Sequence, residues 1–382
     1  MNQINSTHRL DNLDIVRFIL AYTIMFFHAF YGWKENFGYP SFVMNEAGTN
    51  LSHLGGYIEN VIHNFSLGGE AFFLISGFMI MLLLLGEQDS KGDIHIRSFY
   101  IKRSLRVLPL YFIVLATGPI FTWLMDAKVP NYSAWIFLLG NIDLAHNGWS
   151  AVSVNHLWSV DIEMQFYFII PLVLVFIRRK HLPLFFTFII FLSFIYRIFA
   201  FHSQNPWQLI YLHSLSRMDT LAIGCWVGLI YHERKNFIFI NTLPVRMMFY
   251  FILFYILCVD QFTDYSNLFY ATAKKYFYLL ACCYFLANYL FNPIAKLVPK
   301  KRNFLHYLGL VTFGIYMFNN MVIAVMITIC KHYPAVKNFW VYFIIINIIT
   351  IPLAILSYHF LELPISNLKR YIVKTNVELK KA

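Results

Sequence analysis

The sequence predicts an all-α membrane protein, a bundle of about ten transmembrane helices, from its composition and from the spacing of its apolar runs. Hydrophobic residues make up 59% of the 382 positions and charged residues only 13%. Soluble domains carry about a quarter charged residues, so this chain lacks the side chains that a water-facing surface needs. Lipid must therefore surround it. The 40 Phe and 25 Tyr fit this class, because aromatic residues anchor helices at bilayer interfaces.

Ten apolar runs are long enough to cross a hydrocarbon core about 30 Å thick. A shorter run near 134–144 is expected to be an interfacial or re-entrant piece. The first run lacks a small-residue cleavage site, so we expect it to stay as a membrane anchor rather than to be removed as a signal peptide. The expected spans are 13–33, 67–86, 104–125, 159–177, 184–201, 217–232, 245–261, 274–291, 307–330 and 338–361.

The net charge of +11 could indicate nucleic-acid binding, but the positions of the basic residues indicate membrane topology instead. They form short runs between apolar stretches, as in Arg178–Lys180, Arg234–Lys235, Lys300–Arg302 and Lys369–Arg370. With a cytoplasmic N-terminus, 21 of the 30 Lys and Arg residues lie in inside segments, eight lie outside, and Arg17 lies within the first helix. This bias follows the positive-inside rule and predicts that both termini are cytoplasmic. We expect no nucleic-acid partner.

The remaining composition predicts one membrane-embedded domain over residues 1–382, without an appended soluble domain. The five cysteines are expected to be free, buried small hydrophobes, and no metal site is expected, because no cysteine has metal-ligand spacing. Two outer segments, about 34–66 and 126–158, are expected to be long polar loops. A polar substrate could be held there.

Ionisable side chains at membrane depth indicate function, because they are costly to bury in lipid. Arg17 and His28 lie eleven residues apart in the first span, close to three helical turns, so they share a face about 16 Å apart along the axis. Asp14 lies one turn before Arg17 on nearly the same stripe. The alternative is an Arg that snorkels to the interface and a His that is bonded within the bundle.

Arg103 and Arg106 are one turn apart, and we expect them at the N-terminal, cytoplasmic end of the third span. Helix N-termini attract anions, and guanidinium groups bind phosphate in a bidentate manner. This pair therefore predicts a nucleotide-phosphate site. The alternative is positive-inside anchoring alone.

Two carboxylates are expected just below the outer surface, Glu70 at the start of the second span and Glu163 at the start of the fourth. Asp161 lies nearer the interface and is expected to be solvated. His28 lies fifteen residues above Leu13, about 22 Å along the helix, so we expect it in the same outer layer. We predict that His28 faces the bundle interior near one carboxylate. Glu163 is the first choice, because Tyr167 lies one turn further along the same helix face. The alternative is that Glu163 only ties helices together.

Six motifs occur in a fixed order along nearly the whole chain. They are Leu13–Arg17 with His28; Phe72–Phe78; Arg103 and Arg106 with Pro109; Leu157–Ser159 with Glu163, Phe166, Tyr167 and Pro171; Arg217 and Asp219 with Gly224; and Ser357 with Glu362 and Pro364. In this order they resemble the membrane acyltransferase 3 family, bacterial enzymes that O-acylate carbohydrates and related exported molecules. The chain departs at Asn319–Asn320, where the family often has a histidine, which leaves His28 as the better candidate base.

The resemblance implies an integral-membrane O-acyltransferase of the bacterial inner membrane with acyl-coenzyme A, most often acetyl-coenzyme A, as the donor. Arg17, Arg103 and Arg106 would gather at the cytoplasmic mouth and hold its phosphates, and Ser76 is assigned to the same donor site. His28 would take the proton of the acceptor hydroxyl as it attacks the thioester, with Glu163 and Glu70 as the carboxylates that assist it. A route through an acyl-His28 intermediate stays open.

The implied acceptor is a sugar of a surface polysaccharide or its lipid-linked precursor, approaching from the outer loops. Some relatives carry an esterase-like extracellular domain, which this sequence lacks, so we expect direct transfer to the acceptor. The rival hypothesis is a transporter or flippase of glycan or other polar cargo, which would also use intramembrane Arg, His and Glu. A purely structural membrane partner would leave the buried charges unexplained.

Overall fold

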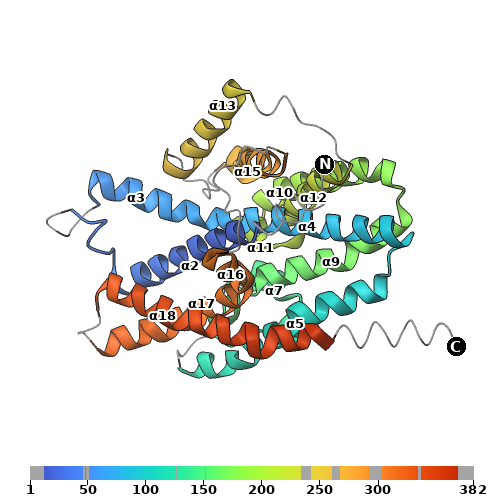
Figure 1. Cartoon of the computed structure of the whole chain (residues 1–382). Coiled ribbons are helices and arrows are strands. Elements are labelled where there is room, and N and C mark those ends of the chain that lie inside the picture. The colour runs from blue at the N-terminus through green and yellow to red at the C-terminus, as the bar shows by residue number, and fades with distance from the viewer. Residues whose placement is uncertain are drawn as a thin grey trace. The chain divides into compact units, whose positions relative to one another are not determined.

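The computed structural model describes residues 13–45, 48, 51–124, 128–150, 152–233, 242–259, 267–291, 303–333 and 337–368. Within these ranges the regular secondary structure is helical, apart from one isolated bridge between Met44 and Leu51 (Figure 1). The predicted all-α class is therefore confirmed. Three of the basic runs (Arg234–Lys235, Lys300–Arg302 and Lys369–Arg370) and both termini lie outside the described residues, so the predicted orientation of the chain stays a prediction.

In the described part of the chain, seven helical stretches are long and apolar enough to cross a membrane. They include seven of the expected spans. The helices concerned are α2 (Leu13–Phe37); α3 (His53–Asn64), η1 (Phe65–Leu67) and α4 (Gly68–Lys91) taken together; α5 (Ile96–Leu124); α9 (Trp158–Phe176); η2 (Arg179–His181) with α10 (Leu182–Phe201); α17 (Thr312–His332); and α18 (Phe339–Ser357) with η6 (Tyr358–Glu362).

The other three expected spans are helical and close to their predicted bounds, but shorter or less apolar. They are α12 (Ser214–His232), α13 (Leu243–Phe254) with η4 (Tyr255–Val259), and α15 (Lys274–Phe291). The count of ten spans therefore stays a prediction. Short helices fill several connections: α6 (Tyr132–Ile136), α7 (Gly140–Asn147), α8 (Val152–Asn155), α11 (Pro206–Leu212), α14 (Leu268–Thr272) and α16 (Phe304–Leu310).

The third span begins earlier than predicted, at Ile96 instead of residue 104. Gly92, with φ of +78°, makes the turn before it, and neither Gly nor Pro interrupts the segment from Ile96 to Arg103. The helix therefore continues through the basic segment. Arg103 and Arg106 lie two to three turns inside α5, so the expectation that they sit at an exposed helix N-terminus is wrong.

The outer segment 34–66, expected as a polar loop, contains helix α3. Lys34 at the end of α2 pairs with Glu59 on α3 at 2.6 Å, and the Tyr31 hydroxyl hydrogen-bonds with Nδ1 of His63 at 2.9 Å. These contacts hold α3 against α2. The segment near 134–144 forms the short helices α6 and α7, separated by Leu138 with φ of +59°, and neither is long enough to span. The expectation of a non-spanning piece is confirmed.

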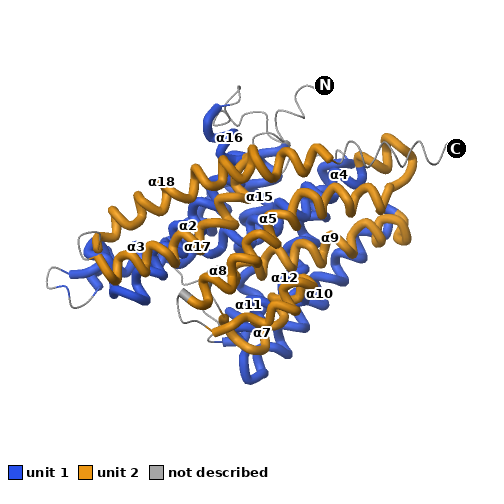
Figure 2. Tube along the Cα trace, turned by 90° about the horizontal axis from the view of Figure 1, so that it is seen from below, with its two compact units in different colours: residues 1–85, 179–309 blue, residues 86–178, 310–382 orange. Residues whose placement is uncertain are grey.

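The chain forms two compact units, each made of two separate stretches of sequence (Figure 2). Unit 1 comprises residues 1–85 and 179–309, and unit 2 comprises residues 86–178 and 310–382. Each of the two halves of the sequence therefore contributes to both units.

In unit 1, the contacts between α4 and α12 show that the two helices run parallel. Residue numbers rise by four along both helices from one contact to the next. The facing pairs are Glu70 with Thr220, Leu74 with Gly224, and Phe78 with Gly228. Both helices are even-numbered spans in the predicted order, so they should run in the same direction. The internal packing of unit 1 agrees with that order.

Two glycines let the backbones of α4 and α12 touch. A Cβ added to Gly77 would collide with the carbonyl of Leu221, and one added to Gly224 would collide with the carbonyl of Leu74. Cys225, on the same face of α12, donates from its thiol to the Gly77 carbonyl at 3.2 Å. Small residues at this spacing are the usual means of close helix packing in membranes.

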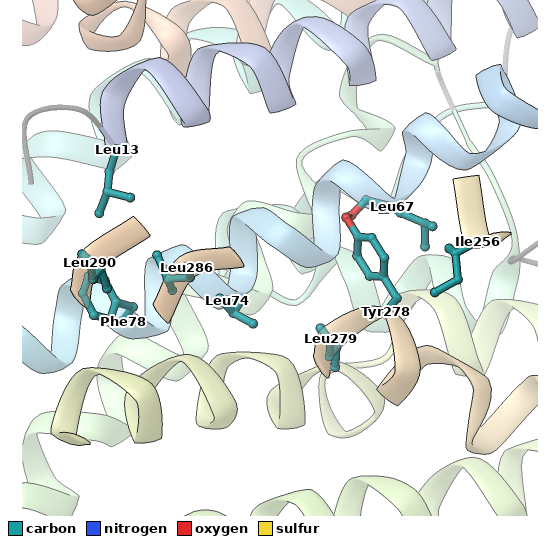
Figure 3. Close-up of a cluster of buried hydrophobic side chains, with 9 residues drawn as sticks. All are labelled: Leu13, Leu67, Leu74, Phe78, Ile256, Tyr278, Leu279, Leu286 and Leu290. Atoms are coloured by element: carbon teal, nitrogen blue, oxygen red, sulfur yellow. The ribbon is translucent and has the colours of Figure 1, made fainter. Parts of the chain in front are cut away.

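An apolar cluster fills the space between these helices and α15 (Figure 3). The Tyr278 hydroxyl, at its polar edge, donates to the carbonyl of Leu67 at 3.1 Å. The cluster consists of Leu13, Leu67, Leu74, Phe78, Ile256, Tyr278, Leu279, Leu286 and Leu290.

All five cysteines are free, as predicted, although only Cys225 and Cys330 are fully buried.

In unit 2, helices α5 and α9 run antiparallel. The Tyr100 hydroxyl donates to the Phe168 carbonyl at 2.6 Å, and further along α5 the Tyr111 hydroxyl donates to Asp161 at 2.7 Å. Helices α17 and α18 pack closely where Gly314 meets Ala354. This framework positions the polar residues of α5, α9 and α17 described below.

Candidate functional site

His28 lies in the second half of α2, in unit 1, and is half-buried. Its ring lies 5.3 Å from the ring of Phe27, and Tyr31 one turn later bonds to His63. The histidine therefore occupies an aromatic environment beside α3. Glu163, its expected partner, belongs to unit 2, so that pairing stays a prediction.

Arg17 forms an ion pair with Asp14 at 3.6 Å, three residues earlier on α2, and both side chains are about a quarter exposed. The predicted stripe of Asp14 and Arg17 is therefore confirmed. Ser76 lies on α4 and is half-buried. Neither finding tests the assignment of Arg17 or Ser76 to the donor site, which stays a prediction.

Glu70 is buried at the start of α4 and faces α12 and α15. It forms an ion pair with Arg217, accepts a hydrogen bond from the Thr220 hydroxyl at 2.7 Å, and lies 3.9 Å from the ammonium of Lys275. Among the described residues of unit 1, no contact with His28 accompanies these. Glu70 is therefore fully engaged in holding helices together, and its predicted catalytic role stays a prediction.

Asp219 forms the centre of the same cluster and is fully buried. Its two oxygens accept from Arg197 at 2.8 Å and from Lys275 at 2.8 Å. Arg197 also donates to the Tyr276 hydroxyl at 2.5 Å. We refer to Glu70, Arg197, Arg217, Asp219 and Lys275 as the ion cluster.

Arg197, Arg217 and Lys275 are three of the eight basic residues that the predicted topology counts as outside. The structure does not test this orientation, but it shows that Arg197 is completely buried and Arg217 nearly so. Each cation is paired with a carboxylate on a neighbouring helix, and Asp219 serves two of them, which a charge count along the chain cannot detect. The only sequence signal was the Arg217 and Asp219 motif.

In unit 2, Arg103 lies over the ring of Tyr167, with 4.9 Å between the guanidinium carbon and the ring centroid. The Tyr167 hydroxyl donates to Glu163 at 3.4 Å, and the Glu163 carboxylate is close enough to act electrostatically on Arg103. The prediction that Tyr167 shares a face with Glu163 is confirmed. Arg103 and Glu163, chosen separately from the sequence, thus belong to one interacting group.

Arg106 is exposed on α5, one turn from Arg103. Glu362, in the π-helical turn η6, accepts from the Ser357 hydroxyl at 3.2 Å and is within electrostatic range of Arg106. π-helical turns are frequent at functional sites. A cationic surface formed by Arg103 and Arg106 therefore has a carboxylate on each side, Glu163 and Glu362.

Tyr316 on α17 contacts the other end of the same face of α9. Its hydroxyl donates to the His156 carbonyl at 2.5 Å and lies 2.7 Å from Ser159 Oγ. His156 Nε2 in turn bonds to the Met317 carbonyl at 3.0 Å. Ser159, Glu163 and Tyr167 are spaced by four residues, so they form one continuous polar stripe on α9.

Asp161, expected to be solvated, is fully buried instead. It accepts a hydrogen bond from Tyr111 and lies against the first backbone amides of α7, at Gly140 and Asn141. A carboxylate at a helix N-terminus is stabilising. Asp161 therefore holds the short helix α7 against α9.

Asn319, at the position where the resemblance leads one to expect a histidine, is buried. Its amide group donates to the carbonyls of Ile315 and Tyr316, within its own helix. This side chain is an amide that cannot exchange protons near pH 7, which agrees with the absence of a base at this position.

Unit 2 therefore has a cation at one end of the α9 stripe, a carboxylate in the middle, and hydroxyl groups at the other end. Such an arrangement can bind an anionic group and a polyol along one helix face. In the ion cluster of unit 1, three cations and two carboxylates are paired with one another across neighbouring helices, so this cluster offers a rigid support instead.

A family model described as an acyltransferase domain matches residues 10–359. The O-acetyltransferase OatA of Staphylococcus aureus (strain NCTC 8325 / PS 47) is 25% identical over 327 residues, which are 78% of this chain and 52% of that protein. A Bacillus subtilis (strain 168) protein named "Putative peptidoglycan O-acetyltransferase YrhL" is 24% identical over 328 residues, 78% of this chain and 50% of that protein. The chain thus spans about half the length of these relatives. No solved structure matches it.

Proposed function

Because the chain belongs to the membrane acyltransferase 3 family, whose domain covers residues 10–359, we propose that this multi-pass membrane protein is an O-acyltransferase. The donor is a cytoplasmic acyl-coenzyme A, with acetyl as the transferred group. The acceptor is a hydroxyl of a surface polysaccharide or of its lipid-linked precursor on the outer side of the bacterial inner membrane. Both termini lie in the cytoplasm, and a reporter fused to the C-terminus that reads outside would contradict this orientation.

The observation that carries the proposal is the group formed by Arg103, Tyr167 and Glu163. Arg103 and the exposed Arg106 supply guanidinium groups for the phosphates of coenzyme A. The aromatic ring under Arg103 fixes its side chain, so that less rotamer freedom is lost when a phosphate binds.

In the proposed reaction, the acceptor hydroxyl attacks the thioester carbonyl, a C–O bond forms and the C–S bond breaks. The neutral imidazole of His28 takes the hydroxyl proton, which is then passed to the departing thiolate to give free coenzyme A. Glu163 stabilises positive charge that develops near it during this step. A two-step route through acyl-His28 would have the same balance, and trapping of labelled enzyme would distinguish it.

The test uses purified protein in lipid nanodiscs, radiolabelled acetyl-coenzyme A, and surface glycan from which O-acetyl groups have been removed by mild base. We expect release of coenzyme A and label on the glycan. His28→Ala should abolish both while the protein stays folded and membrane-inserted. Glu163→Gln should lower turnover more than donor affinity.

Glycan movement across vesicles, without coenzyme A release or label transfer, would favour the transporter hypothesis and overturn the proposal. Wild-type levels of transfer in His28→Ala would leave the acyltransferase assignment intact but remove the histidine from the mechanism.

A further inference from the structure

The polar stripe on α9 contains one hydroxyl whose hydrogen-bond direction can be derived. Tyr316 and the backbone carbonyl of His156 are 2.5 Å apart, and a carbonyl oxygen can only accept. The single hydrogen of the Tyr316 hydroxyl is therefore committed to that carbonyl. In the 2.7 Å contact with Ser159, the Tyr316 oxygen must then be the acceptor, and Ser159 must donate.

This chain of donors fixes the chemical character of Ser159. With its only hydrogen directed at Tyr316, the Ser159 oxygen can offer nothing but lone pairs to any other group. A serine within a helix usually donates to the carbonyl four residues earlier, and the same commitment prevents that. Ser159 is therefore a fixed hydrogen-bond acceptor.

Glu163, one turn along α9, is also an acceptor when it is ionised. Side chains four residues apart on a helix have Cβ atoms about 5–6 Å apart. Two acceptors at this spacing match a ligand that presents two neighbouring donors. Both side chains are half-buried, whereas Val160, Asp161 and Ile162 between them are buried, so the stripe is the more exposed face of this part of α9.

The chemistry along the stripe also separates two kinds of ligand. Arg103 lies beside Tyr167, on one side of Glu163, and attracts anions. Ser159 lies on the other side, where two acceptors would repel a phosphate and attract hydroxyl groups. The same helix face therefore has an anion-binding end and a hydroxyl-binding end.

We propose that Ser159 and Glu163 bind two neighbouring hydroxyl groups of the carbohydrate acceptor, and that Tyr316 is the positioning residue that makes Ser159 an acceptor. The proposal rests on the proposed acyltransferase function. Without the Tyr316 hydroxyl, the Ser159 hydroxyl hydrogen can turn to Glu163 or to the helix backbone. Ser159 is then no longer held as an acceptor for a substrate hydroxyl group.

The experiment compares Tyr316→Phe, Ser159→Ala and the double variant in nanodiscs, with acetyl-coenzyme A and the de-O-acetylated surface glycan of the producing bacterium. Each single variant should lower kcat/KM for the glycan roughly tenfold, the effect of one or two lost hydrogen bonds. The double variant should fall about tenfold as well, not a hundredfold, because the two residues act as one unit. The KM for acetyl-coenzyme A should stay within about twofold of the wild type, because the donor phosphates are expected at the Arg103 end of the stripe.

Tyr100→Phe is the matched control. Like Tyr316→Phe, it removes a tyrosine hydroxyl that donates to a backbone carbonyl, here that of Phe168 on α9 at 2.6 Å, away from the Ser159 end of the stripe. This control should keep the glycan KM. Tyr316 would be only a packing residue if the two single effects on kcat/KM multiply in the double variant. The same conclusion would follow if the KM for acetyl-coenzyme A rises as much as the KM for the glycan. Unchanged single variants would overturn the inference, whereas an inactive wild type would count against the proposed function itself.

Discussion

The ion cluster of unit 1 and the α9 stripe of unit 2 contain the same kinds of side chain but treat them differently. In the ion cluster, Asp219 is fully buried and its two oxygens are taken by Arg197 and Lys275. In the stripe, Glu163 and Arg103 are half-buried and both contact Tyr167, Arg103 through the ring and Glu163 through the hydroxyl. The fully buried charges of the ion cluster join helices, whereas the half-buried charges of the stripe are the ones proposed to bind a substrate. The sequence presents both groups simply as ionisable residues in apolar runs.

The largest effect should follow the loss of Asp219. Asp219→Asn leaves Arg197 and Lys275 without their carboxylate in a dry environment, and breaking a buried ion pair costs about 3–5 kcal/mol. We expect the purified protein to be lost or to melt at a much lower temperature, as followed by fluorescence-detected size-exclusion chromatography after heating. Glu35→Gln, at an exposed position of α2, is the control and should melt like the wild type.

A double variant sharpens this test. Replacing a whole buried ion pair by neutral groups is often tolerated, so Lys275→Gln added to Asp219→Asn should recover part of the lost stability. If Asp219→Asn instead keeps full stability and loses only activity, the ion cluster belongs to the functional site and the contrast with the stripe fails.

Arg103→Ala should act in the opposite way, on the donor and not on stability. A lost charge-assisted phosphate bond costs about 1.5–3 kcal/mol, which corresponds to a 10- to 150-fold higher KM for acetyl-coenzyme A. Arg103→Lys should retain only part of the affinity for acetyl-coenzyme A, because Lys cannot form the bidentate hydrogen bonds of a guanidinium group. An unchanged KM in the alanine variant would make Arg103 a topology signal, as the positive-inside alternative states.

The close approach of α4 and α12 should be the next most sensitive feature. Gly224→Val places a side chain against the Leu74 carbonyl, and overpacking of this kind costs about 1–3 kcal/mol. The melting temperature should fall, with activity falling in proportion to folded protein. Gly86→Ala is the control, because a Cβ there meets nothing within 4 Å. Equal melting temperatures for Gly224→Val and Gly86→Ala would mean that α4 and α12 can move apart without loss of stability.

Hydropathy and charge were sufficient to predict the helical membrane fold, because lipid forces every backbone group into internal hydrogen bonds. They also predicted that Tyr167 and Glu163 share a face, since helical spacing alone decides this. They failed at the start of α5, where the apolar span begins near residue 104 but nothing interrupts the helix back to Ile96. They also failed at Asp161, whose partners Tyr111 and Asn141 are distant in sequence. Tertiary pairing, as in Arg197 with Asp219, has no local signature.

The smallest effect is expected at Arg106. Its side chain is exposed, so water and salt weaken its attraction for a phosphate, and exposed ion pairs contribute only about 0.2–1 kcal/mol. Arg106→Ala should therefore raise the KM for acetyl-coenzyme A about two- to fivefold at low salt, and the difference from the wild type should shrink as salt increases. Arg103→Ala, at a half-buried position over Tyr167, should keep most of its effect at high salt. Equal salt sensitivity of the two variants would show that burial does not distinguish the two arginines.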